Sequence, residues 1–311
     1  MKRRSFLKTG LLTGAAAIAG GTGLLKAETV SEGMPAYKPV PDEWNDTEIS
    51  VAWIGHSTVY INFYGYKIIT DPVLYAKVGI YMLGYIYGPS RLTAPALTID
   101  EMPRPDLILL SHAHMDHTDY KTLKEFTRRY PGQIDAITAF NTADVTSALQ
   151  WKSLREMDWG EEIRTDALRI KALEVRHFGW RYPWERDRSR GFMDNGRSYN
   201  AYILERNGRK ILFGGDTAMT DLFKKSGEKA DIAIMPIGAY NPWLRNHCTP
   251  EEALEMAKHV EAKVFIPIHC NTLKQGMEPF HEPLTRLRNA HQTYNISLGL
   301  DNVGQTFIDR A

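Results

Sequence analysis

Short runs of apolar residues, each of strand length, recur along the chain from about residue 48 onward. Runs of about four to eight residues that alternate or cluster apolar side chains are typical of β-strands. The continuous apolar run at Leu107–Leu110 indicates a strand that is buried on both faces. The predicted strands cover residues 49–54, 59–63, 66–70, 107–110, 134–138, 168–175, 199–205, 210–213, 232–236 and 264–268.

Segments with helical character lie between these strands. The predicted helices cover residues 121–130, 142–151, 217–226, 250–260 and 283–291. The helix at residue 250 has the clearest start, because Thr249 can cap its N-terminus and Pro250 favours the first turn. Strands and helices are mixed throughout, with neither a linker nor a repeat between them. The pattern therefore predicts a single α/β domain.

Composition and charge exclude several classes of protein. A chain of 311 residues, 43% of them hydrophobic, can bury a core without cross-links. The 38 basic and 37 acidic residues give a net charge of +1, which argues against nucleic acid as a partner. Two cysteines exclude a disulfide scaffold, although a single bridge between Cys248 and Cys270 stays open. The composition also excludes disorder and a protein with several membrane spans.

The N-terminus is typical of a targeting segment. Arg3 and Arg4 resemble the start of a twin-arginine export signal, and an apolar run rich in alanine and glycine follows. This run is short and weakly hydrophobic for a membrane span, with a short anchor helix as the alternative. We expect a partner in the twin-arginine export machinery and a periplasmic location, with membrane association left open. The expected divisions are an export signal at 1–27, an extended lead-in at 28–47 and a folded domain at 48–311.

The densest group of polar ligand types follows the buried strand at 107–110. His112, His114, Asp116 and His117 lie within six residues. In an extended segment His112 and His114 point to the same side, whereas Asp116 and His117 would turn toward a second position. Imidazole and carboxylate ligands suit zinc, iron or manganese. The spacing favours two adjacent cations over one, with a polar surface loop as the alternative.

Three further residues of ligand type follow other predicted strands. They are His177, Asp216 and His269. Strand ends of α/β folds are where binding sites collect, so these side chains are expected near the first group. Each alone could be a structural polar residue, but together they would complete a site for two metals.

The motif His-x-His-x-Asp-His resembles the signature of the metallo-β-lactamase-fold superfamily. Other stretches resemble the branch that contains the N-acylphosphatidylethanolamine phospholipase D enzymes and the ascorbate-6-phosphate lactonase-like proteins. These stretches are Trp53–Thr58, Thr70–Pro72, Gly88–Arg91, Gly215–Thr217, Pro236–Tyr240, Thr249–Ala253 and Ile268–His269. The resemblance covers about residues 48–290 and implies a four-layer αββα sandwich, with the site between the sheets at one edge.

The resemblance also implies two divalent metal ions, with Zn²⁺ favoured over Mn²⁺ or Fe²⁺. The implied ligands are His112, His114 and His177 for one cation, Asp116, His117 and His269 for the other, and Asp216 as a bridge between them. Such a pair of cations activates water for attack on phosphorus or a carbonyl carbon. Asp116, His56 and His247 are candidates for proton transfer or oxyanion contact, with structural support as the alternative for the two histidines.

Departures from the branch affect the expected substrate more than the metal chemistry. Cys270–Thr272 stands where the branch commonly has Trp-Gly-Thr, and Ala218 and Met219 stand where a tyrosine is common. We expect a hydrolase that cleaves a phosphodiester such as an N-acylated phospholipid in phospholipase D fashion. The alternatives are a lactonase or small phosphoester hydrolase, a redox di-iron protein, and a metal- or ligand-binding protein of the same fold without turnover.

Residues 74–97 concentrate aromatic and aliphatic side chains. They predict either a lid that packs on the core or an apolar surface that touches acyl chains or a bilayer. Other aromatic residues flank the expected site: Trp180, Tyr182, Trp184, Tyr240 and Trp243. An arginine-rich stretch could meet a phosphate or form a solvated face, and its members are Arg181, Arg186, Arg188 and Arg190.

Overall fold

The computed structural model describes residues 33–83, 85–186, 188 and 196–310. The predicted export signal at 1–27 and the first part of the lead-in lie outside the described residues. Residues 33–47 are irregular apart from the short 3-10 helix η1 (Pro41–Glu43) and an isolated bridge between Gly33 and Thr93. In the described part of the chain, no helix is both long enough and apolar enough to cross a membrane.

Two seven-stranded mixed sheets form the centre of the described fold. In spatial order, the first sheet contains β16 (Thr306–Asp309), β1 (Ile49–Gly55), β2 (Thr58–Phe63), β3 (Tyr66–Thr70), β6 (Leu107–Leu109), β7 (Asp135–Ala139) and β8 (Ser153–Met157). The second contains β15 (Ser297–Leu298), β14 (Val264–Ile268), β13 (Ile232–Pro236), β12 (Arg209–Phe213), β11 (Asn200–Arg206), β10 (Arg169–Glu174) and β9 (Glu162–Arg164). Strands β3 to β8 run parallel in the first sheet, as do β12 to β15 in the second.

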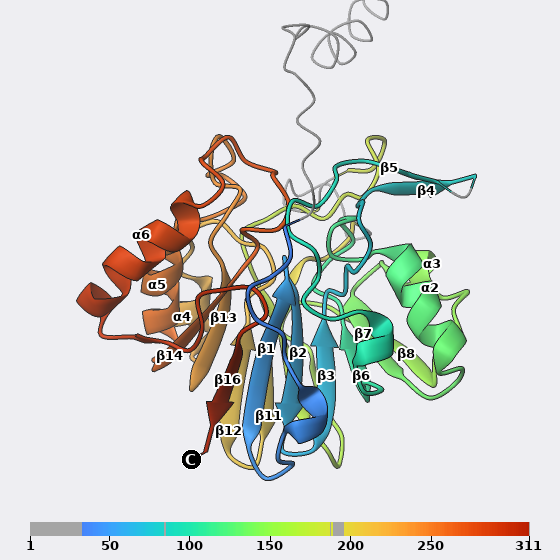
Figure 1. Cartoon of the computed structure of the whole chain (residues 1–311), viewed down its shortest axis with the longest axis horizontal. Coiled ribbons are helices and arrows are strands. Elements are labelled where there is room, and N and C mark those ends of the chain that lie inside the picture. The colour runs from blue at the N-terminus through green and yellow to red at the C-terminus, as the bar shows by residue number, and fades with distance from the viewer. Residues whose placement is uncertain (1–32, 84, 187, 189–195, 311) are drawn as a thin grey trace, which may run out of the picture. The chain divides into compact units, whose positions relative to one another are not determined.

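Helices cover the outer faces of both sheets (Figure 1). The α-helices are α2 (Tyr120–Arg129), α3 (Ala143–Thr146), α4 (Leu222–Ser226), α5 (Pro250–His259) and α6 (Glu282–Ala290). Two further 3-10 helices are η2 (Ile99–Glu101) and η4 (His291–Tyr294). Because α2 and α3 lie beside the first sheet and α4 to α6 beside the second, the predicted four-layer αββα sandwich is confirmed.

The layers explain why the central strands are apolar throughout. In β1, Val51 and Trp53 belong to the core between the two sheets, whereas Ala52 and Ile54 pack in the cluster that contains Phe126 of α2. Both faces of the strand are therefore buried, and the sequence shows a continuous apolar run instead of an alternation.

Two of the predicted helices are much shorter than expected. The prediction at 142–151 is wrong beyond α3, because the Trp151 indole donates to the Thr146 carbonyl at 2.9 Å and the chain then enters β8. The prediction at 217–226 is wrong before α4, because the Ala218 amide donates to the Arg176 carbonyl at 2.8 Å. In both segments tertiary or turn hydrogen bonds replace helical ones.

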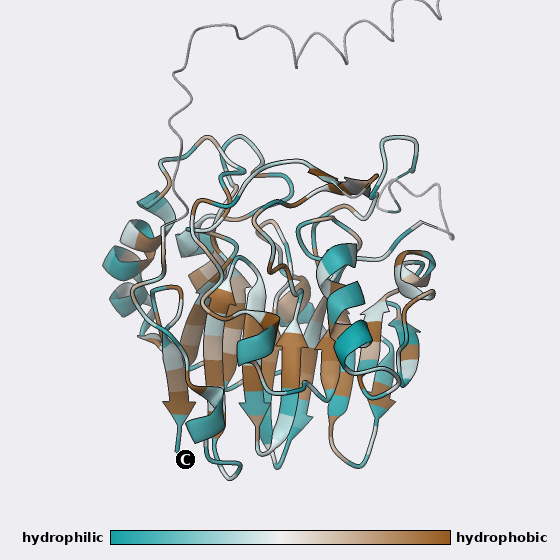
Figure 2. Ribbon diagram, turned by 45° about the vertical axis from the view of Figure 1, so that its right-hand side comes forward, coloured by the Kyte–Doolittle hydropathy of each residue, from teal (hydrophilic) through white to brown (hydrophobic). Residues whose placement is uncertain are grey.

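The segment at 74–97 forms a projecting hairpin of β4 (Ile80–Met82) and β5 (Tyr85–Tyr87). The hairpin itself is exposed, since Leu83 is 85% exposed and Tyr85 is 70% exposed, whereas Ala96 and Leu97 at the end of the segment are buried in the core. Figure 2 shows this hydrophobic hairpin beyond the ends of the sheets, among the loops. Strands β8, β9, β15 and β16 and this hairpin were not among the predicted elements.

Candidate metal centre

The proposed ligands meet because five strands end at the same edge of the sandwich. In the first sheet β1 and β6 run in the same direction, and His56 and His112 follow their carboxyl ends. In the second sheet His177, Asp216 and His269 follow β10, β12 and β14, which also share one direction. The Asn200 amide donates to the Ser111 carbonyl at 2.9 Å and joins the two sheets beside these residues.

One group of three histidines has the spacing of ligands around a single cation. His114 Nδ1 lies 2.8 Å from His112 Nε2 and 3.2 Å from His177 Nε2. Two ligands at about 2.0–2.1 Å from a tetrahedral ion lie about 3.3 Å apart, so these nitrogens fit one ion. All three side chains could hold a metal together, and they are the residues that the resemblance implied for one cation.

A second group surrounds Asp116. Its Oδ2 lies 3.4 Å from His117 Nε2 and 3.5 Å from His269 Nε2. Asp216 lies between the groups, with Oδ2 at 3.2 Å from His117 Nε2, 3.0 Å from His269 Nε2 and 3.9 Å from His177 Nε2. The structure therefore brings together all seven residues that the resemblance implied.

Buried polar atoms in this cluster fit a pair of cations. Among the described residues, His117 Nε2, His269 Nε2 and Asp216 Oδ1 are buried without a well-formed hydrogen bond, and the two ring nitrogens have only ion-pair contacts with carboxylate oxygens. A buried polar atom without a partner costs free energy unless something else satisfies it. Cations bound by these atoms would satisfy them.

Burial keeps most of the histidine rings neutral. It lowers the pKa of His177 to about 3 and that of His114 to about 4, and it lowers the pKa of His112 well below its usual value. A neutral imidazole has one unprotonated nitrogen, which is the form that binds a metal. These three residues are the same histidines that form the first group.

The carboxylates carry the negative charge of the site. Burial alone would raise the pKa of Asp216, but the attraction of His117 and His269 outweighs it and holds this pKa well below the usual value. Burial likewise opposes a charge on His117, yet Asp216, Asp116 and Asp71 raise its pKa well above the usual value. The site thus requires positive charge beside its carboxylates, and divalent cations would supply it.

A second set of contacts selects which ring nitrogen faces the cluster. His117 Nδ1 donates to Asp71 Oδ2 at 2.7 Å, and His112 Nδ1 lies 2.8 Å from Ser111 Oγ, which itself donates to Asp71 at 2.5 Å. His177 Nδ1 donates to the Asn246 carbonyl at 2.8 Å. Each ring then presents its Nε2 inward. Such outer contacts fix the tautomer and orientation of ligand histidines.

Sequence reasoning missed Asp71, although it noted the Thr70–Pro72 stretch. The available signal was an aspartate directly after a buried strand, the same signal that pointed to Asp216. It also missed Gln275, whose Nε2 donates to Asp116 Oδ2. Gln275 lies in an irregular loop with no periodic pattern, so the sequence carried no sign of this contact.

Backbone shape brings Asp216 close to the first sheet. Gly215 has φ of +57°, and a Cβ there would lie 2.8 Å from both the Asn200 carbonyl oxygen and Ser111 Cβ. Only glycine fits this approach without displacing a neighbour. His56 and His269 also have positive φ, of 54° and 60°, which is strained for residues with side chains and recurs at functional sites.

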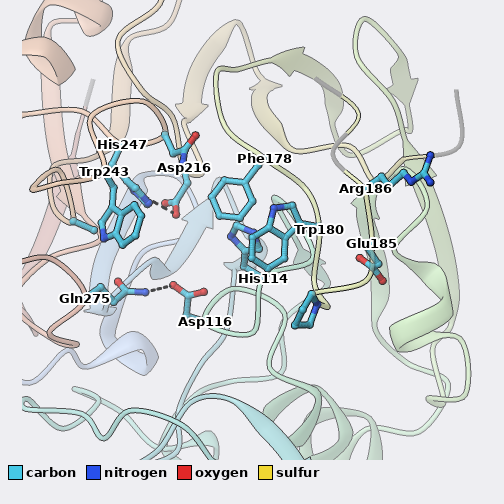
Figure 3. Close-up of a pocket in the computed structure, with 13 residues that line it drawn as sticks. His114, Asp116, Phe178, Trp180, Glu185, Arg186, Asp216, Trp243, His247 and Gln275 are labelled. Atoms are coloured by element: carbon cyan, nitrogen blue, oxygen red, sulfur yellow. Dashed lines mark hydrogen bonds and ion pairs between the residues drawn. The ribbon is translucent and has the colours of Figure 1, made fainter. Parts of the chain in front are cut away.

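The two remaining histidine candidates occupy different places. His56 is 1% exposed, and its Nε2 lies 3.0 Å from Asp116 Oδ2, the same oxygen that faces His117 and His269, so the ring belongs to the second group. His247 lines the cavity above the cluster, with Nδ1 at 3.8 Å from Asp216 Oδ2 (Figure 3). Burial lowers the pKa of both rings to about 3, so both are neutral near pH 7.

A cavity of about 840 Å³ opens onto the cluster. Figure 3 shows Phe178 and Trp180 beside His114, with Trp243 across from them. The polar lining includes Asp116, Asp216 and His247 on one side and Glu185 and Arg186 on the other. The cavity therefore combines aromatic walls with a polar floor, as ligand pockets commonly do.

The other flanking residues have varied positions. Tyr182 and Trp184 stack at 4.9 Å between ring centroids, and Tyr240 donates to Glu282 instead of facing the cavity. Arg181 donates to the carbonyls of Ala113 and Thr118, and Arg188 pairs with Asp158. Arg190 lies outside the described residues. Cys248 and Cys270 are both buried as free thiols.

The fold and the buried His/Asp cluster together define a metal-dependent hydrolase with the metallo-β-lactamase fold. Residues 66–270 match the model of the Beta-lactamase superfamily domain, and the chain belongs to this family. The predicted resemblance is thereby confirmed. The clusters are consistent with a binuclear metal site, and zinc stays a prediction.

Named relatives and solved structures agree with this assignment. The chain is 30% identical to the N-acyl-phosphatidylethanolamine-hydrolyzing phospholipase D 1 of Caenorhabditis elegans, over 85% of this chain and 79% of that protein. The metallo hydrolase Igni18 of Ignicoccus hospitalis is 19% identical, with a TM-score of 0.60 over 85% of this chain and 100% of the other. The metallo-beta-lactamase fold protein YhfI of Bacillus subtilis is 16% identical, with a TM-score of 0.58 over 84% and 100%.

Proposed function

We propose that the protein hydrolyses a phosphodiester bond of a lipid such as an N-acylated phospholipid. The observation that carries this proposal is the cavity of about 840 Å³, whose aromatic wall leads directly to the His/Asp cluster. That volume lies within the range of about 300–1,000 Å³ for small-molecule sites. The similarity to the Caenorhabditis elegans N-acyl-phosphatidylethanolamine-hydrolyzing phospholipase D 1 supports the same substrate class.

The residues divide between holding cations and arranging the substrate. His112, His114 and His177 would hold one cation, and Asp116, His117 and His269 the other, with Asp216 shared between them. When bound, divalent cations supply an activated water nucleophile and stabilise charge on phosphoryl oxygens. Zn²⁺ suits this mixture of imidazole and carboxylate ligands, and Mn²⁺ or Fe²⁺ would also be accepted.

The remaining polar groups orient the substrate and move protons. Water adds to phosphorus, the bond between phosphorus and the head-group oxygen breaks, and that oxygen takes up a proton. His247 faces the cavity as a neutral imidazole, so it is placed to accept a proton from the attacking water and to pass it to the departing oxygen. Arg186 adds positive charge to the opposite wall of the cavity, and His56 positions Asp116.

The test compares metal content and hydrolysis in the wild-type chain and in Asp216→Ala. Three substrates are offered: an N-acylated phospholipid, a generic phosphodiester and a lactone. We expect about two metals per wild-type chain. We expect Asp216→Ala to lower activity by more than about 100-fold. Mutation of residues that only support the ligands lowers activity by about 10- to 100-fold, so loss of a ligand should exceed that range.

Asp221→Ala is the matched control, because Asp221 is exposed, lies five residues away and pairs only with Lys225 among the described residues. It should retain both metal and activity. Preference for the lactone over both phosphodiesters would contradict the proposed substrate. Fewer than one metal per wild-type chain, or full activity in Asp216→Ala, would contradict the two-metal mechanism and favour a binding protein of the same fold.

A further inference from the structure

We infer that the β4–β5 hairpin and the mouth of the cavity form one docking surface for an anionic lipid bilayer. The inference deepens the proposed function and rests on it for the identity of the substrate as a lipid. Binding to a bilayer can be measured without turnover, so the two proposals can fail separately.

The hairpin presents apolar side chains to solvent. Leu83 at its tip is 85% exposed, Tyr85 is 70% exposed and Met82 is 52% exposed. Single exposed apolar residues are ordinary, but contiguous ones mark interaction sites. A pair of three-residue strands has no partner sheet in the described part of the chain, so nothing there buries this patch.

The apolar surface continues around the cavity mouth. Trp243 lines the cavity and is 52% exposed, and its neighbour Leu244 is 53% exposed. Trp184 is 77% exposed beside the cavity residue Glu185, and Met277 is 74% exposed two residues after Gln275. Three separate loops thus add large apolar side chains to the same rim.

Packing joins the hairpin to the site. Val73 and Val78 at its base cluster with Leu273, and Met115 packs against that cluster. Met115 lies between the ligand candidates His114 and Asp116, and Leu273 lies two residues before the cavity residue Gln275. A bilayer bound by the hairpin would therefore lie next to the entrance of the cavity.

The charge of these segments identifies the occupant. The loop that contributes Trp184 to the rim carries Glu185 next to Arg186. Residues 72–98, 241–247 and 271–277 contain no aspartate or glutamate. Their exposed charged side chains are all basic, namely Lys77, Arg245 and Lys274. Tryptophan and tyrosine favour the boundary between water and lipid, and basic residues attract anionic head groups. A bilayer with anionic lipid satisfies both features.

The test measures binding of the full, metal-loaded chain to vesicles by co-sedimentation. Vesicles of phosphatidylcholine with phosphatidylglycerol are compared with vesicles of phosphatidylcholine alone, at low and high salt. We expect Leu83→Asp to lower the partition coefficient about tenfold or more, because an apolar side chain no longer enters the bilayer. Val40→Asp is the matched control, since Val40 is 49% exposed but lies on the N-terminal lead-in, away from the cavity lining.

A second pair of variants tests the charges. Lys77→Glu with Lys274→Glu should weaken binding to the anionic vesicles alone, and Lys263→Glu, exposed between α5 and β14, should not. Thermal unfolding of each variant verifies that it is folded.

Absence of wild-type binding, or equal losses in Leu83→Asp and Val40→Asp, would overturn the inference. A wild-type dimer that Leu83→Asp dissociates, without vesicle binding, would also overturn it and assign the hairpin to self-association. Vesicle binding without cleavage of N-acylated phospholipid would support the docking surface while contradicting the proposed substrate.

Discussion

A single buried carboxylate organises much of the cluster. Asp71 receives hydrogen bonds from His117 and Ser111, and Ser111 in turn contacts His112. Because the carboxylate only accepts hydrogen bonds, His117 directs a protonated Nδ1 to it, and His112 directs Nδ1 to the Ser111 hydroxyl that donates to Asp71. Both rings then leave Nε2 for a metal. Asp71 also has φ of 36°, so backbone strain is concentrated at this supporting residue.

We expect Asp71→Asn to weaken metal binding by about 10- to 100-fold while the fold is retained. Asp71 accepts from the Ser111 amide at Oδ1 and from the Ser111 hydroxyl and His117 Nδ1 at Oδ2, whereas asparagine has one oxygen and its NH2 would face one of these donors. Affinity is measured by competition with a chelator of known strength, and circular dichroism monitors the fold. Asp46→Asn, at an exposed aspartate, is the control. Equal affinity in the wild-type chain and Asp71→Asn would show that the tautomer is set elsewhere.

At the scale of single elements, the sequence predicted the start of a helix correctly where the helix has its own N-terminal capping residues. Helix α5 begins with a capping box, in which Thr249 Oγ1 accepts from the Glu252 amide at 3.3 Å and Glu252 accepts from the Thr249 amide at 2.9 Å. Helix α3 has no such box. Its first amides are satisfied from β8, where Glu156 accepts from Thr142 and Ala143 at 2.7 and 2.6 Å.

We expect Thr249→Ala to lower the free energy of unfolding by about 1 kcal/mol, because the Glu252 amide loses the Thr249 hydroxyl as its acceptor and the capping box is broken. Urea unfolding measures the change. Thr285→Ala on the exposed face of α6 is the control and should stay within about 0.5 kcal/mol of the wild type. Changes of equal size in both variants would assign the effect to threonine removal in general and not to the cap.

At the scale of the whole molecule, both sheets contribute residues to the site. Asp116 follows β6 of the first sheet, and Asp216 follows β12 of the second. Asp216 is buried and Asp116 is partly buried, and the neighbouring histidines hold the pKa of both carboxyl groups well below the usual value. Cations held between them would therefore bind the folded sandwich and not its separated halves, and this linkage stabilises the fold by mass action.

We expect removal of metal by a chelator to lower the melting temperature of the wild-type chain by about 5–10 °C when the metal had been present at about 100 times its dissociation constant. Differential scanning calorimetry with and without chelator measures the shift. Asp216→Ala should show a much smaller shift, since a shared ligand is gone. An unchanged melting temperature of the wild-type chain after addition of the chelator would contradict the coupling between metal binding and folding.

The sequence by itself determined most of the central strands and the candidate ligands. The apolar runs of β13 and β14 have the predicted bounds, because strands buried on both faces leave a continuous hydrophobic signal. The ligand candidates were visible because each follows such a run, and His112–His117 adds an unusual density of imidazoles. Local chemistry was sufficient at these positions.

Only the tertiary structure decided which distant groups act together. The contact of Gln275 with Asp116, the aromatic wall from Phe178 to Trp243 and the apolar rim with the hairpin join loops far apart in the chain. Irregular loops carry no periodicity, so their mutual placement depends on how the two sheets pack. The sequence supplied the side chains, and the packing of one sheet against the other placed them around a common cavity.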